Sequence, residues 1–252
     1  MAYQLQISPH PSELRAQYLD SLSEPQEFFV EALVSGGTTL TYGGFAYAVV
    51  AGDMLVEIYT TPAHTHNLVE LFQLVIDKHS INTVLCKSYD TQLLYAALSK
   101  EAKVATAGYL FRRILDVPHE RTAAGVCFRA AEHKDIEAVM QINDDFFESI
   151  EEVSDYRTNG GLFVLETNQG IVGCGTGKAV VPGRDDIDIG MLVAKTHRNR
   201  GLGRYIASCL KDHFLRHGLR PICGCGASNH ASKRALEKAG FACDHRLLSI
   251  SY

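Results

Sequence analysis

A glycine-rich basic turn at residues 198–203 constrains the fold of this chain more than any other feature. The turn reads Arg-Asn-Arg-Gly-Leu-Gly, follows the apolar run 187–194 and precedes a segment with helical periodicity over 205–217. Glycines let a backbone approach an anion closely, and the N–H groups at a helix start point toward it. Arg198, Arg200 and Arg204 add charge that complements a pyrophosphate. The order strand, basic turn and helix therefore predicts a site for a phosphorylated ligand.

Two other phosphate-binding loops fit the sequence less well. A Walker A string, Gly-x-x-x-x-Gly-Lys-Ser/Thr, does not occur in it. The run 173–177, Gly-Cys-Gly-Thr-Gly, misses the Rossmann spacing by one residue and opens no helix. The remaining pattern, Arg-x-x-Gly-x-Gly after a Val-containing strand, resembles motif A of the GNAT superfamily of N-acetyltransferases. In that superfamily the loop binds the pyrophosphate of acetyl-coenzyme A.

A second motif follows about thirty residues later. Residues 229–241 read Asn-His-Ala-Ser-Lys-Arg-Ala-Leu-Glu-Lys-Ala-Gly-Phe and resemble motif B of the same superfamily. Asn229 is a favourable N-cap for the helix that this motif begins. Periodicity over 126–252 predicts a strand, two helices, three strands, a helix, a strand, a helix and a strand, which is the GNAT order. We therefore expect a mixed α/β GNAT fold, with a mostly antiparallel twisted sheet flanked by helices.

Length and composition predict two domains. The 252 residues are 46% apolar, which is enough for one large or two ordinary cores. Pro, Gly and small residues gather near 116–125, so we place the domains at 1–122 and 123–252. The first half repeats the order hairpin, helix, strand, helix, strand, which indicates a degenerate GNAT copy in tandem; an unrelated α+β cap is the alternative. Residues 64–67 of the first half correspond to the basic turn at 198–203, here called the phosphate turn, but they contain neither glycine nor arginine.

Charge and cysteine usage bound the partners and the compartment. Residues 1–125 carry 8 Lys and Arg against 13 Asp and Glu, whereas 126–252 carry 16 of each. One local basic cluster fits a small polyanion better than a nucleic acid. The sequence has no apolar run of roughly 18 residues and no signal-peptide pattern, so no membrane partner is expected. Seven cysteines, an odd number with no zinc spacing, favour a reduced cytoplasmic protein without metal. The oligomeric state is left open between a monomer and a homodimer.

The resemblance implies roles for individual residues of the cofactor site. The strand before the turn would pair with the pantetheine arm, the turn would surround the pyrophosphate, and the motif B helix start would border the other side. Asn199 replaces the usual glycine, and asparagine tolerates the left-handed conformation. The implied cofactor-binding residues are Leu192, Val193, Arg198, Asn199, Arg200, Gly201, Leu202, Gly203, Arg204, Asn229 and Ser232.

Catalysis requires a neutral amine, a polarised thioester and a proton source for the leaving thiolate. In the superfamily a carboxylate on the motif A strand often acts as the base. Asp188 stands at that position, and Asp186 lies two residues before it on the same strand face; a solvated acidic strand end is the alternative for both. The usual acid is a Tyr of the motif B helix, and Leu236 takes its place here. The substitutes are Tyr252, Tyr205, Cys225 and His230.

The resemblance implies an acetyl-CoA-dependent N-acetyltransferase. The acetyl group would move to a primary amine of a small molecule or protein by direct attack in a ternary complex. Two alternatives stay open from the sequence. One is a catalytically weak acyl-CoA-binding sensor, which the leucine at position 236 favours. The other is a transferase that uses another acyl-CoA donor.

Overall fold

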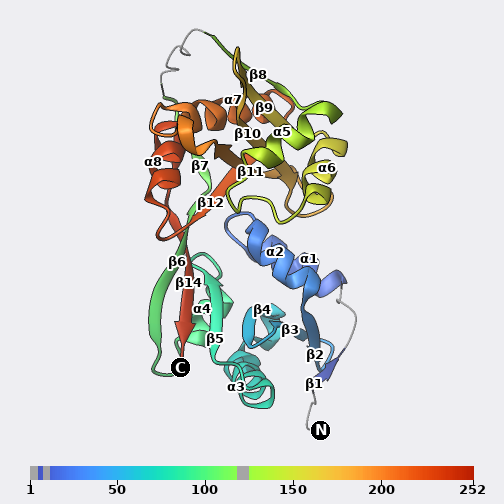
Figure 1. Ribbon diagram of the computed structural model, residues 1–252. Coiled ribbons are helices and arrows are strands. Elements are labelled where there is room, and N and C mark those ends of the chain that lie inside the picture. The colour runs from blue at the N-terminus through green and yellow to red at the C-terminus, as the bar shows by residue number, and fades with distance from the viewer. Residues whose placement is uncertain (1–4, 8–11, 118–124) are drawn as a thin grey trace. The chain divides into compact units, whose positions relative to one another are not determined.

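The computed structural model describes residues 5–7, 12–117 and 125–252 and divides the chain into two compact units (Figure 1). The first unit contains residues up to 110 together with 245–252, and the second contains 111–244. The boundary that the sequence predicts, at residue 122, lies outside the described residues. Among the described residues, no helix is long and apolar enough to cross a membrane.

The second unit is built on a sheet in the order β8-β9-β10-β11-β12. Neighbouring strands are antiparallel except β11 and β12, which are parallel. The strands are β8 (Val126–Ala130), β9 (Leu162–Thr167), β10 (Gly170–Ala179), β11 (Asp186–Val193) and β12 (Arg220–Gly226), with a separate pair of β7 (Arg113–Ile114) and β13 (Phe241–Ala242). The helices are η2 (His133–Asp135), α5 (Ile136–Gln141), α6 (Ile150–Thr158), η3 (Lys195–His197), α7 (Leu202–Arg216) and α8 (His230–Lys238). The mixed, mostly antiparallel architecture is the one that the sequence predicts.

Strand β10 carries helices on both of its faces. On one face Gly173, Gly175 and Gly177 alternate beneath α7, and a Cβ atom on Gly177 would stand 2.1 Å from the Phe214 ring. On the other face Cys174 belongs to a core that includes residues of α5 and α6. The glycine run that fits no nucleotide loop therefore lets a helix pack closely on a strand.

Strands β11 and β12 separate along their length. Their parallel pairing covers Asp186 with Arg220, Ile187 with Pro221 and Asp188 with Ile222. Both strands then continue, β11 to Val193 and β12 to Gly226. Beyond Asp188 and Ile222 the two strands are no longer hydrogen-bonded to each other. Their divergence leaves room for a ligand between them.

The first unit has the same kind of sheet, in the order β1-β2-β3-β4-β5-β14-β6. Among the strands that the structure describes in this unit, β4 and β5 form a parallel pair and the other neighbouring strands are antiparallel. The strands are β1 (Leu5–Ile7), β2 (Thr38–Tyr42), β3 (Ala46–Ala51), β4 (Met54–Thr60), β5 (Thr83–Lys87), β6 (Lys103–Phe111) and β14 (His245–Ser251). The helices are α1 (Ser12–Ser21), α2 (Phe28–Gly36), η1 (Pro62–Asn67), α3 (Leu68–His79) and α4 (Thr91–Ala97).

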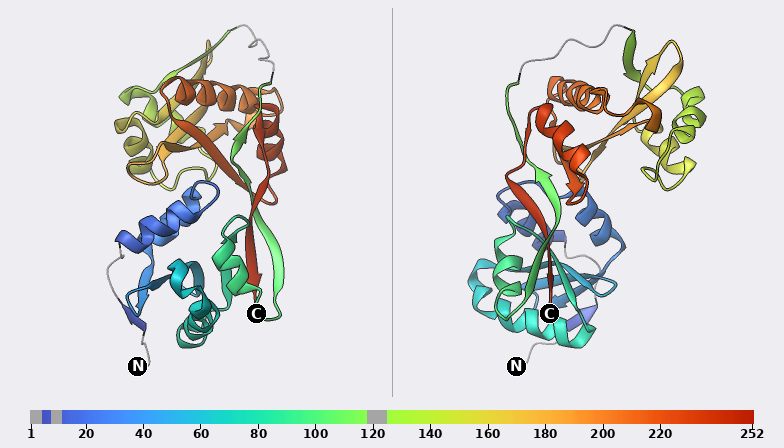
Figure 2. Two further views of the ribbon diagram at one scale, coloured as in Figure 1. Left: turned by 180° about the vertical axis from the view of Figure 1, so that it is seen from behind. Right: turned by 60° about the vertical axis from the view of Figure 1, so that its left-hand side comes forward.

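The last strand corrects one expectation from the sequence. The order of elements placed residues 246–252 in the sheet of the C-terminal domain. Instead β14 pairs with β5 and β6 of the first unit, as both views of Figure 2 show for the red strand beside the green one. Ile250 is fully buried in the core of that unit, and Leu248 packs against the same core. The apolar pattern of the segment predicts a strand, but it does not specify which sheet the strand joins.

A buried polar network fills the interior of the first unit beside its own diverging strands. Pairing of β4 with β5 ends at Leu55 and Val84, and Glu57 and Lys87 follow it, both fully buried. Lys87 Nζ donates hydrogen bonds to Tyr18 Oη (2.6 Å) and to Gln26 Oε1 (2.7 Å). Gln26 Nε2 in turn donates to Glu57 Oε1 (2.7 Å).

Asp90, Tyr47 and Arg15 complete the network. Tyr18 Oη donates to Asp90 Oδ2 (2.6 Å), which also lies 3.6 Å from the Lys87 ammonium. Tyr47 Oη donates to Glu57 Oε2 (3.0 Å), and Arg15 Nη2 lies 3.3 Å from Glu57 Oε1. Burial and the neighbouring carboxylates raise the pKa of both tyrosines. The buried charges are therefore paired and hydrogen-bonded, which is the condition under which a protein interior tolerates them.

Candidate functional site

A cavity of about 1100 Å³ lies in the second unit where β11 and β12 diverge. The turn after β11 and the start of α7 line one end, and Ile189, Gly190 and Phe146 line another part of its wall. Ten of the eleven predicted cofactor residues line the cavity: Leu192, Val193, Arg198, Asn199, Gly201, Leu202, Gly203, Arg204, Asn229 and Ser232. The eleventh, Arg200, is exposed, and its Nη2 donates to the Thr196 carbonyl oxygen (3.3 Å).

The basic turn has the backbone that its sequence requires. Asn199 adopts φ +63° and Gly201 φ +77°, so both are left-handed, and asparagine takes this conformation as expected. Gly201 is the N-cap of α7, and the Tyr205 N–H donates to the Gly201 carbonyl (3.1 Å). The backbone N–H groups in the first turn of α7 have no partner within the helix and point beyond its N-terminus, where they can bind an anion.

Arg198 is oriented by a carboxylate that the sequence analysis did not single out. Its Nη2 donates to Asp144 Oδ2 (2.7 Å), and its Nε donates to the Val193 carbonyl (3.0 Å). Lys195 Nζ lies 2.6 Å from Asp144 Oδ1. The two cations hold the pKa of the Asp144 carboxyl below its usual range. Asp144 therefore ties the segment between α5 and α6 to the phosphate turn.

The motif B helix forms another wall of the cavity. Asn229 Oδ1 accepts a hydrogen bond from the Ser232 N–H (3.0 Å), so Asn229 is the N-cap that the sequence predicts. Leu236, at the position of the usual tyrosine, is buried and lines the cavity. Cys225 and His230 line it as well. Burial raises the pKa of the Cys225 thiol to about 11, so this thiol keeps its proton at neutral pH.

Asp188 lies on β11, close to the part of the strand that lines the cavity. It is two residues before Gly190, so both project to the same face of β11. Lys178 of β10 stands directly opposite it in the sheet register, and Lys178 Nζ lies 5.5 Å from the ring centre of Tyr156. Burial and the negative charges of Asp188 and Glu152 raise the pKa of Tyr156, so its phenol stays protonated. Lys178 and Tyr156 thus join Asp188 in one polar cluster.

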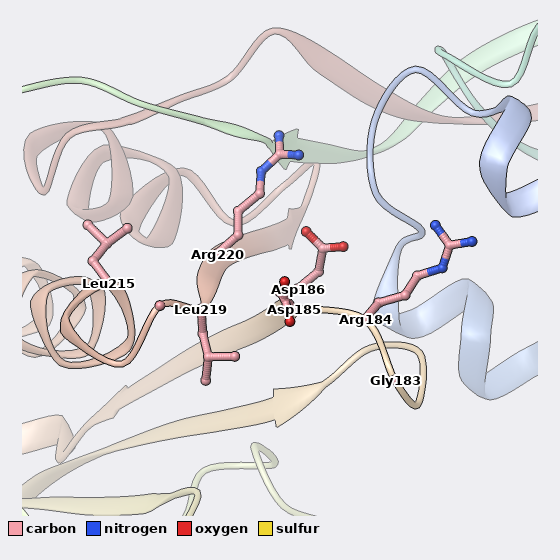
Figure 3. A pocket seen from close by; sticks show the side chains of 8 residues that line it. Gly183, Arg184, Asp185, Asp186, Leu215, Leu219 and Arg220 are labelled. Carbon is pink, nitrogen blue, oxygen red and sulfur yellow. The ribbon is translucent and has the colours of Figure 1, made fainter.

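Asp186 lies at a second cavity, of about 680 Å³, at the paired end of β11 and β12. Figure 3 shows the Asp186 and Arg220 side chains extending to the same side of these strands. Burial raises the pKa of Asp186, and the positive charges of Arg220, Arg112 and Arg184 partly oppose this rise. On this face of β11, Asp188 therefore stands between the second cavity and the first.

Tyr252, the third catalytic candidate, is placed in the first unit. Its Oη donates to the Ala97 carbonyl (2.7 Å), its ring contacts Phe72 edge-on, and Lys100 Nζ lies 4.0 Å from its ring centre. Burial raises the pKa of Tyr252 to about 12. These contacts give the residue a packing role in the first unit.

Comparisons with known proteins agree with this geometry. Residues 128–241 match the Acetyltransferase (GNAT) family, and residues 9–114 match an Acetyltransferase (GNAT) domain. No curated protein matches the chain. The structure is similar to an acetyltransferase from the GNAT family of Colwellia psychrerythraea, with 16% identity, coverage of 99% of each chain and a TM-score of 0.88.

Two further solved structures cover the whole length. A GCN5-related N-acetyltransferase from Sphaerobacter thermophilus has 16% identity, a TM-score of 0.64 and coverage of 99% of this chain and 95% of its own. A tandem GNAT protein from the clavulanic acid biosynthesis pathway has 12% identity, a TM-score of 0.61 and coverage of 100% and 98%. At these identities the structures show a shared fold.

Together these matches define the class of the protein. The chain belongs to the GNAT family of acetyltransferases and contains two GNAT domains in tandem. The family is one of acyltransferase enzymes that use acetyl-CoA as co-substrate. The predicted tandem architecture is thereby confirmed, and the alternative of an unrelated cap is wrong.

Proposed function

We propose that the second unit transfers the acetyl group of acetyl-CoA to a primary amine by direct attack in a ternary complex. One observation carries the proposal. Strand β11 carries both Asp188 and Gly190, and their spacing of two residues puts them on the same face of the strand. Gly190 lines the cavity, and the basic turn begins at Arg198, five residues after the end of the strand at Val193. The same strand therefore carries the candidate base and leads into the turn that would bind the phosphates of the donor.

The chemistry balances with groups of this chain. Asp188 accepts one proton from the attacking ammonium, which leaves the lone pair that forms the new N–C bond. The C–S bond breaks, and its electrons leave with the thiolate of coenzyme A. The nitrogen loses its second proton as the amide forms, and this proton reaches the thiolate. Cys225 and His230, which line the cavity, are the candidate groups to pass it on. Because a thiolate is a tolerable leaving group, Leu236 in place of tyrosine does not prevent the reaction.

The acceptor is a small-molecule amine or a protein amino group. Residues 1–125 carry 8 Lys and Arg against 13 Asp and Glu, so the N-terminal half is acidic. A field of this sign attracts a cationic acceptor by electrostatic steering.

The proposal is tested by mass spectrometry of the co-purified ligand, followed by an amine panel assayed for release of coenzyme A thiol. We expect acetyl-CoA or coenzyme A to co-purify and at least one cationic amine to release thiol. Initial rates should give intersecting double-reciprocal lines, as a ternary complex requires. Parallel lines would contradict direct attack, and tight acetyl-CoA binding with no thiol release from any amine would favour the acyl-CoA sensor.

We predict one acetyl-CoA per chain. The place of the phosphate turn in the first unit is η1, residues 62–67, which has neither glycine nor arginine, and neutral histidines add little charge. The space beside its diverging strands holds the buried network of Glu57 and Lys87. Titration of the full chain with acetyl-CoA by calorimetry should therefore give a stoichiometry near one. A second site of similar affinity, or one located at residues 58–90 in a crystal, would refute this.

A further inference from the structure

The aromatic ring of Phe146 forms part of the cavity wall close to β11. Phe146 lies between α5 and α6 and lines the cavity together with Ile189 and Gly190. A Cβ atom built on Gly190 would stand 2.8 Å from Phe146 Cζ, which is closer than such contacts occur. The ring therefore covers the backbone of Gly190, and it can lie there because this position has no side chain.

The backbone that carries the ring is held from several directions. Asn143 Oδ1 accepts hydrogen bonds from the N–H groups of Phe146 and Phe147 (3.1 Å each), and Asn143 Nδ2 donates to the Phe147 carbonyl (2.9 Å). The Phe147 side chain is buried in the core beneath α5 and α6. The ion pairs of Asp144 with Lys195 and Arg198 tie the same segment to the phosphate turn. The backbone that carries Phe146 is thus held in place, and the 37% exposed ring packs edge-on against the buried Phe147 ring (centroids 4.8 Å apart).

The position of the ring relative to the phosphate turn decides what it contacts. Val193 and Gly190 are three strand residues apart, about 10 Å. With the polyphosphate end of the donor at the basic turn beyond Val193, the pantetheine arm would extend along β11 toward Gly190. The acyl thioester, at the far end of that arm, would then lie on the side of the cavity where the ring stands.

We infer that Phe146, seated on Gly190, limits the acyl group of the donor to acetyl or a group of similar size. This inference rests on the proposed function, since it assigns the donor's orientation in the same cavity. A longer acyl chain would have to displace a ring whose backbone is held by hydrogen bonds, a buried neighbour and two ion pairs. Selection by a wall of this kind discriminates chain lengths by roughly 10-fold or more per added methylene at its best.

The test compares coenzyme A, acetyl-CoA and hexanoyl-CoA by calorimetry with the wild type, Phe146→Ala and Phe146→Leu. Wild type should bind hexanoyl-CoA at least fivefold more weakly than acetyl-CoA. Phe146→Ala should reduce that ratio at least fivefold while the affinity for coenzyme A itself stays within twofold. Phe146→Leu, which keeps an apolar side chain on the loop, should give an intermediate ratio. Phe29→Ala removes an exposed ring of the first unit and should keep the wild-type ratio.

The outcomes separate this inference from the function on which it rests. Binding of coenzyme A with equal affinities for the two acyl-CoAs, or with a ratio that neither Phe146 variant changes, would overturn the inference and leave the proposed function standing. Absence of coenzyme A binding to the wild type would overturn both. Melting curves establish that the variants are folded, and the leucine variant supplies the readout if the alanine variant is not.

Discussion

Replacement of Gly201 by Glu should weaken acetyl-CoA binding at least tenfold. Gly201 is the left-handed N-cap of α7 and lines the cavity, with open space around the position of a Cβ atom. A glutamate there puts a carboxylate where the pyrophosphate belongs and offsets positive charge of the turn. A tenfold loss corresponds to about 1.4 kcal/mol of binding free energy and is measured by calorimetry.

Gly160→Glu is the matched control for this variant. Gly160 also has a left-handed backbone (φ +71°), is exposed, and has open space around a Cβ position. Both variants therefore carry the same charge change and the same cost of placing a side chain at positive φ, which is about 1–2 kcal/mol. Gly160→Glu should bind acetyl-CoA as the wild type does. Equal affinities of wild type and Gly201→Glu would refute the assignment of the turn.

The sequence was sufficient for the parts of the site that are local. The turn and the helix after it depend on residues within a few positions of one another. The left-handed Asn199, the N-cap at Asn229 and the helix that follows each of them are therefore found where the sequence predicts them. The hairpin of β9 and β10 is local in the same sense.

Contacts between distant segments were not predictable in the same way. Asp144 and Phe146 lie about fifty residues before the turn, in a segment without a motif, yet they contact Arg198 and Gly190. The sheet that β14 joins is likewise a matter of tertiary packing. Strand periodicity fixes which side chains share a face, but it contains no information about the partner strand.

Helices of the N-terminal unit were harder to predict from sequence periodicity than those of the C-terminal unit, and there is a physical reason. Helix α1 is largely polar and buries only Tyr18 and Leu19, so its periodicity is faint. Glu57 and Lys87 did carry a signal, since each is a lone charge in an otherwise apolar strand. A buried charge implies a partner, and their common network could have been inferred from the sequence, although its connection through Gln26 could not.

The position of Asp188 leads to the prediction with the largest effect on turnover. Asp188→Asn preserves the size of the side chain but removes its capacity to accept a proton. If Asp188 is the general base, kcat for the true acceptor should fall by roughly 100-fold or more. Acetyl-CoA affinity should stay within twofold, because the phosphate turn and the motif B helix are unchanged. Steady-state thiol release measures kcat, and calorimetry measures the affinity.

Asp155→Asn supplies the comparison, because Asp155 is an exposed acid on α6 of the same unit and its substitution should leave kcat unchanged. The pH profile distinguishes loss of a base from a change in packing. A variant that lacks its base depends on the small fraction of acceptor that is already neutral, so its rate should rise toward high pH as the amine loses its proton. Unchanged turnover in Asp188→Asn would contradict the assignment and move the role to Asp186, or to Glu148, Glu151 or Glu152 at the start of α6. The raised pKa of Asp186 makes that carboxyl the first of these to test.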